Sequence, residues 1–152
     1  MRRTEARGFG VLELLIAIAV GAVIIALVIP ALERYQKVRE LRQASRQLLS
    51  NVRLAQQQAI TLDENVRLAY TAGPPSRYSI EKLDGSGLRH VDLPVAVEVT
   101  GSYVVGTPLE FRPSGAPLAA GEFCLTEGTQ WFRLDVNAGT GRAQLTEAAA
   151  CP

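Results

Sequence analysis

The sequence has few of the side chains that enzymes use for chemistry. His90 is its only histidine, and Cys124 and Cys151 are its only cysteines. A structural zinc site needs four close ligands, which these residues do not supply. Neither a phosphate-binding loop nor a dinucleotide-binding fingerprint is present. The segment Gly85-Ser86-Gly87 is typical of a turn, because no helical pattern follows it as a nucleophile elbow requires. We therefore expect a protein without enzymatic activity, metal or cofactor.

Neither sign of charge predominates in the chain as a whole, since the formal net charge is +1. Its distribution along the chain is uneven. Six basic and two acidic residues lie in 31–62, whereas seven basic and eleven acidic residues lie in 63–152. The acidic distal region as a whole does not form a nucleic-acid-binding surface. The basic residues of 31–62 favour a solvated face, with contact to anionic lipid or DNA as the alternative.

One long apolar run dominates the N-terminus. The nineteen residues Val11–Ile29 are all apolar or small except Glu13. A helix of ~20 apolar residues crosses a hydrocarbon core of ~30 Å, so the run predicts a transmembrane helix. Arg2, Arg3 and Arg7 precede it and favour a cytoplasmic N-terminus with the remainder exported. An acid inside such a span costs roughly 2.5–3.5 kcal/mol on insertion scales, so Glu13 is a candidate functional residue.

Several kinds of N-terminal segment share part of this pattern. A cleavable secretory signal has an apolar core of only ~7–15 residues followed by a small-x-small site, and Pro30-Ala31-Leu32-Glu33 offers no such site. A twin-arginine signal would use Arg2-Arg3 but lacks its usual flanking residues. A plain signal anchor, or a single-pass protein that never assembles, would leave Glu13 without a role. The residues alone leave these alternatives open.

The whole N-terminal pattern resembles the class III signal of type IV pilins and type II secretion pseudopilins. That signal is a short basic leader ending in glycine, then phenylalanine, then an apolar helix with glutamate at the fifth position after the cut. In Arg7-Gly8-Phe9-Gly10-Val11-Leu12-Glu13, cleavage would follow Gly8, and Phe9 would become the new N-terminus. The resemblance implies that the prepilin peptidase also N-methylates Phe9. Glu13 would pair with the Phe9 amine of a neighbouring subunit and set the axial register of assembly.

A second helical pattern follows Pro30, a residue that kinks a helix without necessarily ending it. Small and apolar residues recur at spacings of three and four, which predicts an amphipathic continuation of the helix to Leu62. The stripe comprises Leu32, Tyr35, Val38, Leu41, Ser45, Leu48, Val52, Ala55, Ala59 and Leu62, and we expect it to pack on the C-terminal body. Gln56, Gln57 and Gln58 are good helix formers that we expect to be solvated.

Short alternating segments replace the helical pattern after Asp63. Clusters of glycine, proline and asparagine separate them, which predicts an antiparallel β-sheet or small β-sandwich. The predicted strands are 66–70, 78–83, 88–92, 95–100, 109–112, 122–126, 130–136 and 141–146. Their inner face should bury Leu68, Ile80, Val97, Phe111, Phe123, Phe132 and Leu134. A helix followed only by strands is an α+β fold.

The predicted organisation is therefore a leader at 1–8, a transmembrane and filament-core helix at 9–29, its amphipathic continuation at 30–62, and a β-rich head at 63–152. About 120 residues follow the apolar run, which is enough for one modest hydrophobic core. The N-terminal helix, kinked near Pro30, should pack its second half on the sheet of the head.

Within the pilin superfamily, three further stretches resemble the GspH/FimT family of minor pilins and pseudopilins. They are 41–60 on the predicted helix, Phe111-Arg112-Pro113-Ser114-Gly115, and Thr140-Gly141-Arg142. The resemblance implies a low-copy subunit at or near a filament tip that primes assembly and contacts cargo, a surface or DNA. Its partners would be other pilin or pseudopilin subunits, the prepilin peptidase, the inner-membrane assembly platform and, before assembly, membrane lipid.

Some members of this family bind DNA in natural transformation through arginines in the C-terminal region. Here residues 141–152 contain a single arginine, Arg142, and a single glutamate. Phosphate-backbone binding needs several cations in concert, so the tail does not support direct DNA binding. Two functions stay open. One is a minor pilin of a type IV pilus that supports adhesion, motility or DNA uptake, and the other is a minor pseudopilin of a type II secretion system.

The same resemblance implies a place in the inner membrane with the head in the periplasm, and later in a pilus or pseudopilus. Disulfides persist outside the cytoplasm. We therefore expect Cys124 and Cys151 to pair and to tie the end of the chain to a strand of the head.

Overall fold

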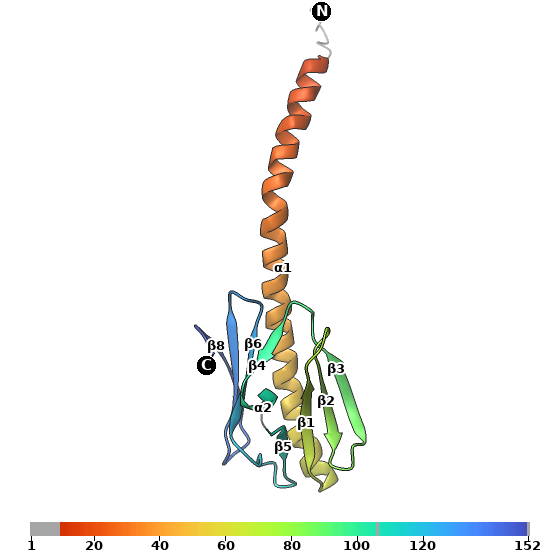
Figure 1. Cartoon of the computed structure of the whole chain (residues 1–152), viewed down its shortest axis with the longest axis vertical. Helices are drawn as coiled ribbons and strands as arrows, with labels where there is room; N and C mark the ends of the chain where they lie inside the picture. Colours follow the sequence, from red (N-terminus) through yellow and green to blue (C-terminus); the bar gives the residue numbers. More distant parts are fainter. Residues whose placement is uncertain (1–9, 106, 152) are drawn as a thin grey trace, which may run out of the picture. The chain divides into compact units, whose positions relative to one another are not determined.

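The structure is a computed structural model that describes residues 10–105 and 107–151, without the side chains of residues 27–31, 88 and 105. In this part of the chain a long helix, α1 (Val11–Leu62), is followed by strands and a short helix, α2 (Ser102–Val105) (Figure 1). The chain divides into two compact units, Met1–Gln36 and Lys37–Pro152. Helix α1 contributes residues to both units.

Four strands of the second unit form one sheet in the order β3-β2-β1-β5, with every neighbouring pair antiparallel. Their bounds are β1 (Val66–Thr71), β2 (Arg77–Lys82), β3 (Gly87–Asp92) and β5 (Leu109–Phe111). The register places Leu68 opposite both Ile80 and Leu109. All three side chains are fully buried, so this face of the sheet forms part of the core.

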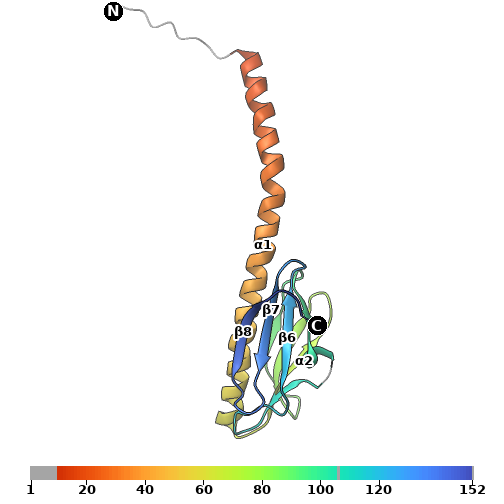
Figure 2. The same ribbon diagram turned by 90° about the vertical axis from the view of Figure 1, so that its left-hand side faces the viewer.

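The other four strands form a second antiparallel sheet in the order β4-β6-β7-β8. Their bounds are β4 (Glu98–Thr100), β6 (Gly121–Thr126), β7 (Trp131–Val136) and β8 (Ala143–Ala148). Figure 2 shows β6, β7 and β8 side by side in this sheet. Leu134 lies opposite Phe123 on one side and Leu145 on the other, and the buried Phe123 and Leu134 mark the inner face.

The second half of α1 supplies the third part of the core. Its buried side chains recur every three or four residues from Leu41 to Ala59, and they join the inner faces of both sheets in one cluster. In Figure 1 the strands of the two sheets flank this part of α1. The fold is thus α+β, a long helix packed on antiparallel sheets, and the predicted fold class is confirmed. The short helix α2 lies in a segment for which the sequence predicted no helix.

The apolar stripe of α1 is buried over only part of its length. Val38 is half-buried, whereas Leu32, Tyr35 and Leu62 are exposed. The prediction that the whole stripe packs on the head is therefore wrong at its ends. Leu62 is the last residue of the helix, and Leu32 and Tyr35 belong to the first unit.

The inner face predicted for the sheets is correct except at one position. Phe132 is half-buried and packs against the rim of the core, because it lies on the core-facing side of β7 near the strand's beginning. The other six predicted residues are buried.

Two polar side chains of α1 are buried together with their hydrogen-bond partners. The Ser45 hydroxyl donates to the Leu41 carbonyl oxygen at 2.8 Å, and the Asn51 amide donates to the Tyr78 hydroxyl oxygen at 2.6 Å. A buried polar group without a partner costs about 1–3 kcal/mol. These bonds therefore make polar residues on the core face of α1 compatible with folding, and the Asn51 bond joins α1 to β2.

Candidate assembly site

The first unit contains the apolar half of α1. The Gly10 carbonyl accepts hydrogen bonds from the backbone N–H groups of Glu13 at 3.0 Å and Leu14 at 3.2 Å, so the helix begins directly after Gly10. Ten large apolar side chains between Val11 and Ile25 are 54–77% exposed. They lie on all sides, because a helix makes a turn about every 3.6 residues. A helix that is apolar all round is stable when lipid or other apolar surfaces surround it.

The membrane-span prediction for Val11–Ile29 is not confirmed by the structure. Among the residues whose side chains are described, which omit 27–31, no helix combines the length and the apolarity that crossing a bilayer requires.

Glu13 is the acidic residue in the first turn of α1, and its side chain is exposed. A carboxylate at this end of a helix interacts favourably with the helix dipole. None of the ion pairs in the described part of the chain involves Glu13. Gly8 and Phe9 lie outside the described residues, so cleavage, N-methylation and the Glu13–Phe9 pairing stay predictions. Pro30 lies within α1, and the kink predicted there also stays a prediction.

Two glycines from separate loops meet in the second unit. Gly115, after β5, and Gly141, before β8, both have positive φ, 77° and 66°. A Cβ atom on Gly141 would lie 2.4 Å from the Gly115 carbonyl oxygen, so the two backbones approach too closely for any other residue at position 141. Gln56 of α1 completes the contact. Its side-chain amide donates to the carbonyl oxygens of Gly115 at 2.7 Å and Thr140 at 3.5 Å.

We call this contact, formed by Gln56, Gly115, Thr140 and Gly141, the glycine–glutamine clasp. It joins α1 to a loop beside each of the two sheets. Both late stretches that resembled the GspH/FimT family contribute to it, so Gly115, Thr140 and Gly141 have a structural role in the head.

All four residues of the clasp lie in a segment that matches a known protein family. The family described as type II transport protein GspH matches residues 44–141, which run from the middle of α1 to Gly141. The chain belongs to the GspH family. It is thereby a member of the type IV pilin and pseudopilin superfamily, whose members are structural subunits that assemble with other pilins or pseudopilins. No curated protein matches the chain by sequence.

Solved structures of filament subunits share the fold of this GspH-family chain. The type IV minor pilin FimU of Pseudomonas aeruginosa is 17% identical in one crystal form, with 74% of this chain and 100% of FimU covered at a TM-score of 0.62. A second crystal form gives 18% identity, 78% and 99% coverage, and a TM-score of 0.64. The minor pseudopilin EpsH of the Vibrio cholerae type 2 secretion system is 12% identical, with 72% and 97% coverage and a TM-score of 0.55.

Gln56 is the residue of the glycine–glutamine clasp that the sequence interpretation missed in this GspH-family chain. It is half-buried, as is Gln58, whereas Gln57 is exposed. The prediction that all three glutamines are solvated is therefore wrong for two of them. Gln56 follows Val52 by four positions and precedes Ala59 by three, so helical spacing places it along the margin of the buried stripe. That spacing could have indicated that Gln56 is not fully solvated. The glycine-containing loops, whose carbonyl oxygens need hydrogen-bond donors, could have indicated its partners.

A disulfide joins Cys124 of β6 to Cys151, 27 positions further along the chain. This matches the pairing expected from the sequence. Cys124 alternates with the core residues Phe123 and Leu125, so it lies on the outer face of its sheet, yet it is fully buried. Since β7 separates β6 from β8, the segment after β8 has to cross β7 to reach Cys124. The bond fixes that segment over the sheet.

Proposed function

We propose that this GspH-family chain is a minor pilin of a type IV pilus, which joins the filament through α1 near its tip and primes assembly. The observation that carries the proposal is the exposed apolar half of α1, with the single acid Glu13 in its first turn. The head already has its own core in the second unit. The apolar half therefore needs an environment from outside the chain, lipid before assembly and neighbouring helices afterwards.

In this role the leader 1–8 is removed by the prepilin peptidase, Phe9 becomes an N-methylated terminus, and the head is held in the periplasm by the inner-membrane helix. The positive Phe9 amine of one subunit then pairs with Glu13 of its neighbour. A buried acid without a partner is strongly destabilising, so the pair favours one axial register over slipped arrangements. Adhesion, motility or DNA uptake follows from the filament, and the chain itself needs no catalytic residue or cofactor.

A minor pseudopilin of a type II secretion system is the second candidate. Two observations favour it, the family description as a type II transport protein and the shared fold with EpsH. The same α1 chemistry serves both candidates, because each filament needs apolar helices and a paired Glu13. They differ in the assembly that contains the subunit.

Replacement of Glu13 tests the mechanism common to both. We expect Glu13→Gln to remain in the membrane fraction and to be cleaved after Gly8, but to be lost from sheared filaments, because the amide cannot neutralise the Phe9 amine. Glu33→Gln is the matched control, since Glu33 is another exposed acid of α1, and it should enter filaments normally. Incorporation of Glu13→Gln at the level of Glu33→Gln would contradict the pairing mechanism.

A deletion strain separates the two filaments. Pilus number, DNA uptake and exoprotein release are measured in parallel, with the wild-type chain and the Glu13→Gln chain supplied in trans. Loss of pili with normal exoprotein release supports the minor pilin. Loss of exoprotein release with normal pili assigns the chain to the secretion system instead.

A further inference from the structure

The second unit has a groove of about 440 Å³ beside the middle of α1. The side chains that line it are those of Arg46, Leu49, Ser50, Asn51, Arg53, Leu54, Gln57 and Arg89. We call it the basic groove, because three of these side chains are arginines and none of those described is a carboxylate. None of its residues belongs to the glycine–glutamine clasp or to the first unit.

Helical spacing brings two of the arginines together on α1. Arg46, Ser50, Arg53 and Gln57 follow one another at intervals of four, three and four residues, so they form one stripe along the helix. All four side chains are exposed. Arg46 and Arg53 are two turns apart, which is about 10 Å along the axis. Their two charges therefore lie on the same exposed face of α1.

The third arginine comes from a different element. Arg89 lies in β3, the edge strand of its sheet, opposite the buried Ile80, so its side chain leaves the sheet on the face that forms part of the core. Asn51 of α1 also lines the groove, and its amide donates to the Tyr78 hydroxyl oxygen at 2.6 Å. Burial raises the pKa of that hydroxyl, while the Asn51 hydrogen bond and the positive charge of Arg89 oppose the rise. Arg89 is therefore close to the α1 residues of the groove.

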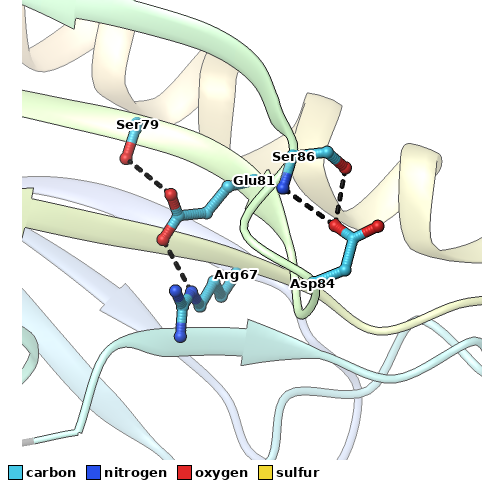
Figure 3. Close-up of polar contacts among 5 residues, drawn as sticks. All are labelled: Arg67, Ser79, Glu81, Asp84 and Ser86. Atoms are coloured by element: carbon cyan, nitrogen blue, oxygen red, sulfur yellow. Dashed lines mark hydrogen bonds and ion pairs between the residues drawn. The ribbon is translucent and has the colours of Figure 1, made fainter.

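Charged side chains elsewhere on the same sheet have partners within the chain. Figure 3 shows the Glu81 carboxylate accepting hydrogen bonds from the Arg67 guanidinium at 2.6 Å and from the Ser79 hydroxyl at 3.5 Å. In the turn that follows β2, the Asp84 carboxylate accepts hydrogen bonds from the Ser86 backbone N–H at 2.8 Å and from its hydroxyl at 2.6 Å. These charges are satisfied without another molecule.

The charge of the basic groove is not balanced in this way. In the described part of the chain, none of its three arginines belongs to an ion pair. One carboxylate, that of Glu147, lines a neighbouring groove that also includes Arg46. An excess of positive charge remains, and like charges around one groove repel one another. An anion bound among the arginines would remove this repulsion.

Two ordinary roles account for part of this charge. Arginines on a helix commonly form a solvated face, and an inward-facing charge on an edge strand prevents pairing with other chains. Neither role explains why arginines from α1 and from β3 line one groove together with the half-buried Leu49 and Leu54. Arginine is enriched at protein–protein interfaces, whereas lysine is depleted there. All three cations of the groove are arginines, so its composition is typical of a surface that binds protein.

We propose that the basic groove binds an acidic segment of a different filament subunit. Guanidinium groups bind carboxylates through paired hydrogen bonds, and Leu49 and Leu54 offer apolar surface to the side chains between the acids. The inference deepens the proposed function and rests on it. Members of this family assemble with other pilins or pseudopilins, and a minor subunit near a tip has subunits of other kinds as its neighbours. Charge complementarity at the groove then selects which of them lies beside this chain.

Nucleic acid would be a different occupant of a basic surface. Its phosphate backbone is bound by several cations in concert, and single strands are also held by aromatic side chains on which their bases stack. The basic groove has three cations, and its described lining includes no aromatic side chain. The groove therefore suits a short acidic segment of protein better than a long polyanion.

Binding of a peptide probe to the full chain, purified in an uncharged mild detergent, is the first test. The probe is a peptide of alternating leucine and glutamate pairs with a neutral fluorophore, and fluorescence anisotropy measures its binding at physiological salt. We expect Arg46→Gln with Arg53→Gln to weaken binding at least about tenfold, because charge-assisted hydrogen bonds are lost. Arg112→Gln with Arg142→Gln removes the same charge from exposed positions outside the groove and should change binding by less than about twofold. No binding at millimolar peptide, or equal losses in the two double variants, would overturn the proposal.

A photo-cross-link identifies the occupant. The full chain carries p-benzoylphenylalanine in place of Gln57, an exposed residue of the groove. It is produced together with each other pilin or pseudopilin of the same organism, in a host that forms neither filament. We expect an adduct with one of these subunits at a segment that contains aspartate or glutamate, located by mass spectrometry.

Charge reversal then tests the chemistry of that adduct. Arg46→Glu with Arg53→Glu should lower its yield about tenfold, since like charges across an interface repel. Replacement of the acids of the partner segment by arginine should restore the yield with this variant. Unchanged circular dichroism checks the fold of each variant. An adduct formed only between two copies of this chain, no adduct with any subunit, or no recovery with the reversed partner would each contradict the proposal.

A single-stranded oligonucleotide, added as a competitor to the peptide assay, provides the last arm. It should leave the peptide bound at physiological salt. If it displaces the peptide and no adduct with a subunit forms, the groove is a nucleic-acid site and the proposal is wrong. Neither assay depends on filament formation, so their outcomes are separate from that of Glu13→Gln in cells. Loss of Glu13→Gln from filaments, together with failure of both assays, would reject the groove contact and leave the proposed function in place.

Discussion

The two halves of α1 are both rich in apolar residues but use them differently. In the second unit, buried side chains of α1 follow one stripe and pack on two sheets. In the first unit, ten large apolar side chains between Val11 and Ile25 stay more than half exposed. One half therefore obtains its apolar surroundings from the chain itself. The other half has to obtain them from outside the chain.

Polar residues on the helix show the same contrast. Ser45, Asn51 and Gln56 each have a hydrogen-bond partner within the second unit. Glu13 in the first unit has no ion-pair partner among the described residues. A polar residue on an otherwise apolar helix is retained where a partner compensates its cost. The same rule supports the proposed pairing of Glu13 with the Phe9 amine of a neighbouring subunit.

A pair of leucine truncations tests this contrast and should have the largest effect. Leu48 is 2% exposed and Leu15 is 59% exposed. We expect Leu48→Ala to lower the free energy of unfolding of the head by about 2–5 kcal/mol, because it leaves a cavity in the core. Leu15→Ala should leave that free energy within ~0.5 kcal/mol of wild type. Urea denaturation of the detergent-solubilised chain, followed by tryptophan fluorescence, measures both.

The sizes of the effects of these two variants on filament assembly should be in the reverse order. After correction for the amount of folded protein, Leu15→Ala should reduce incorporation into filaments and Leu48→Ala should not. A destabilisation by Leu15→Ala comparable to that of Leu48→Ala would show that the two halves of α1 are not independent.

A glycine substitution at the clasp should have the next largest effect. Gly141→Ala places a side chain at φ 66° and 2.4 Å from the Gly115 carbonyl oxygen. We expect the free energy of unfolding to fall by about 2–4 kcal/mol, through left-handed strain and displacement of the loop. Gly139→Ala is the control in the same turn, because its Cβ would make only an ordinary contact, 3.5 Å from the Asn137 side chain. Equal losses for the two variants would rule out close approach as the reason for Gly141.

Patterns within single elements made much of this fold predictable. The change from helical spacing to alternation after Leu62 marks where α1 ends and β1 begins at Val66. The buried face of several strands followed from alternation, as at Leu68 and Ile80. Contacts between distant elements were harder. Neither the Asn51–Tyr78 bond nor the clasp follows from spacing, because each depends on how α1 sits on the sheets.

The acid in the apolar run was visible because it violates the pattern around it. The grouping of Arg46, Arg53 and Arg89 around one groove was not, since arginines on a helix ordinarily form a solvated face. Its third member, Arg89, comes from a strand 36 residues beyond Arg53 in the sequence. Only the packing of β3 beside α1 brings these charges together.

Removal of the Gln56 side chain should have the smallest effect on the free energy of unfolding. It tests whether a single polar contact of α1 within the second unit stabilises the head. Gln56→Ala deletes the amide that bridges Gly115 and Thr140, leaving two loop carbonyl oxygens to water. We expect a loss of about 1 kcal/mol, the usual net value of an intramolecular hydrogen bond. Gln57→Ala is matched in helix propensity and lies on exposed surface, so it should change the free energy of unfolding by less than ~0.5 kcal/mol. In a Gly141→Ala background, where the clasp is already disturbed, Gln56→Ala should cost measurably less than in wild type. Strictly additive losses would mean that Gln56 stabilises the head independently of the glycine contact.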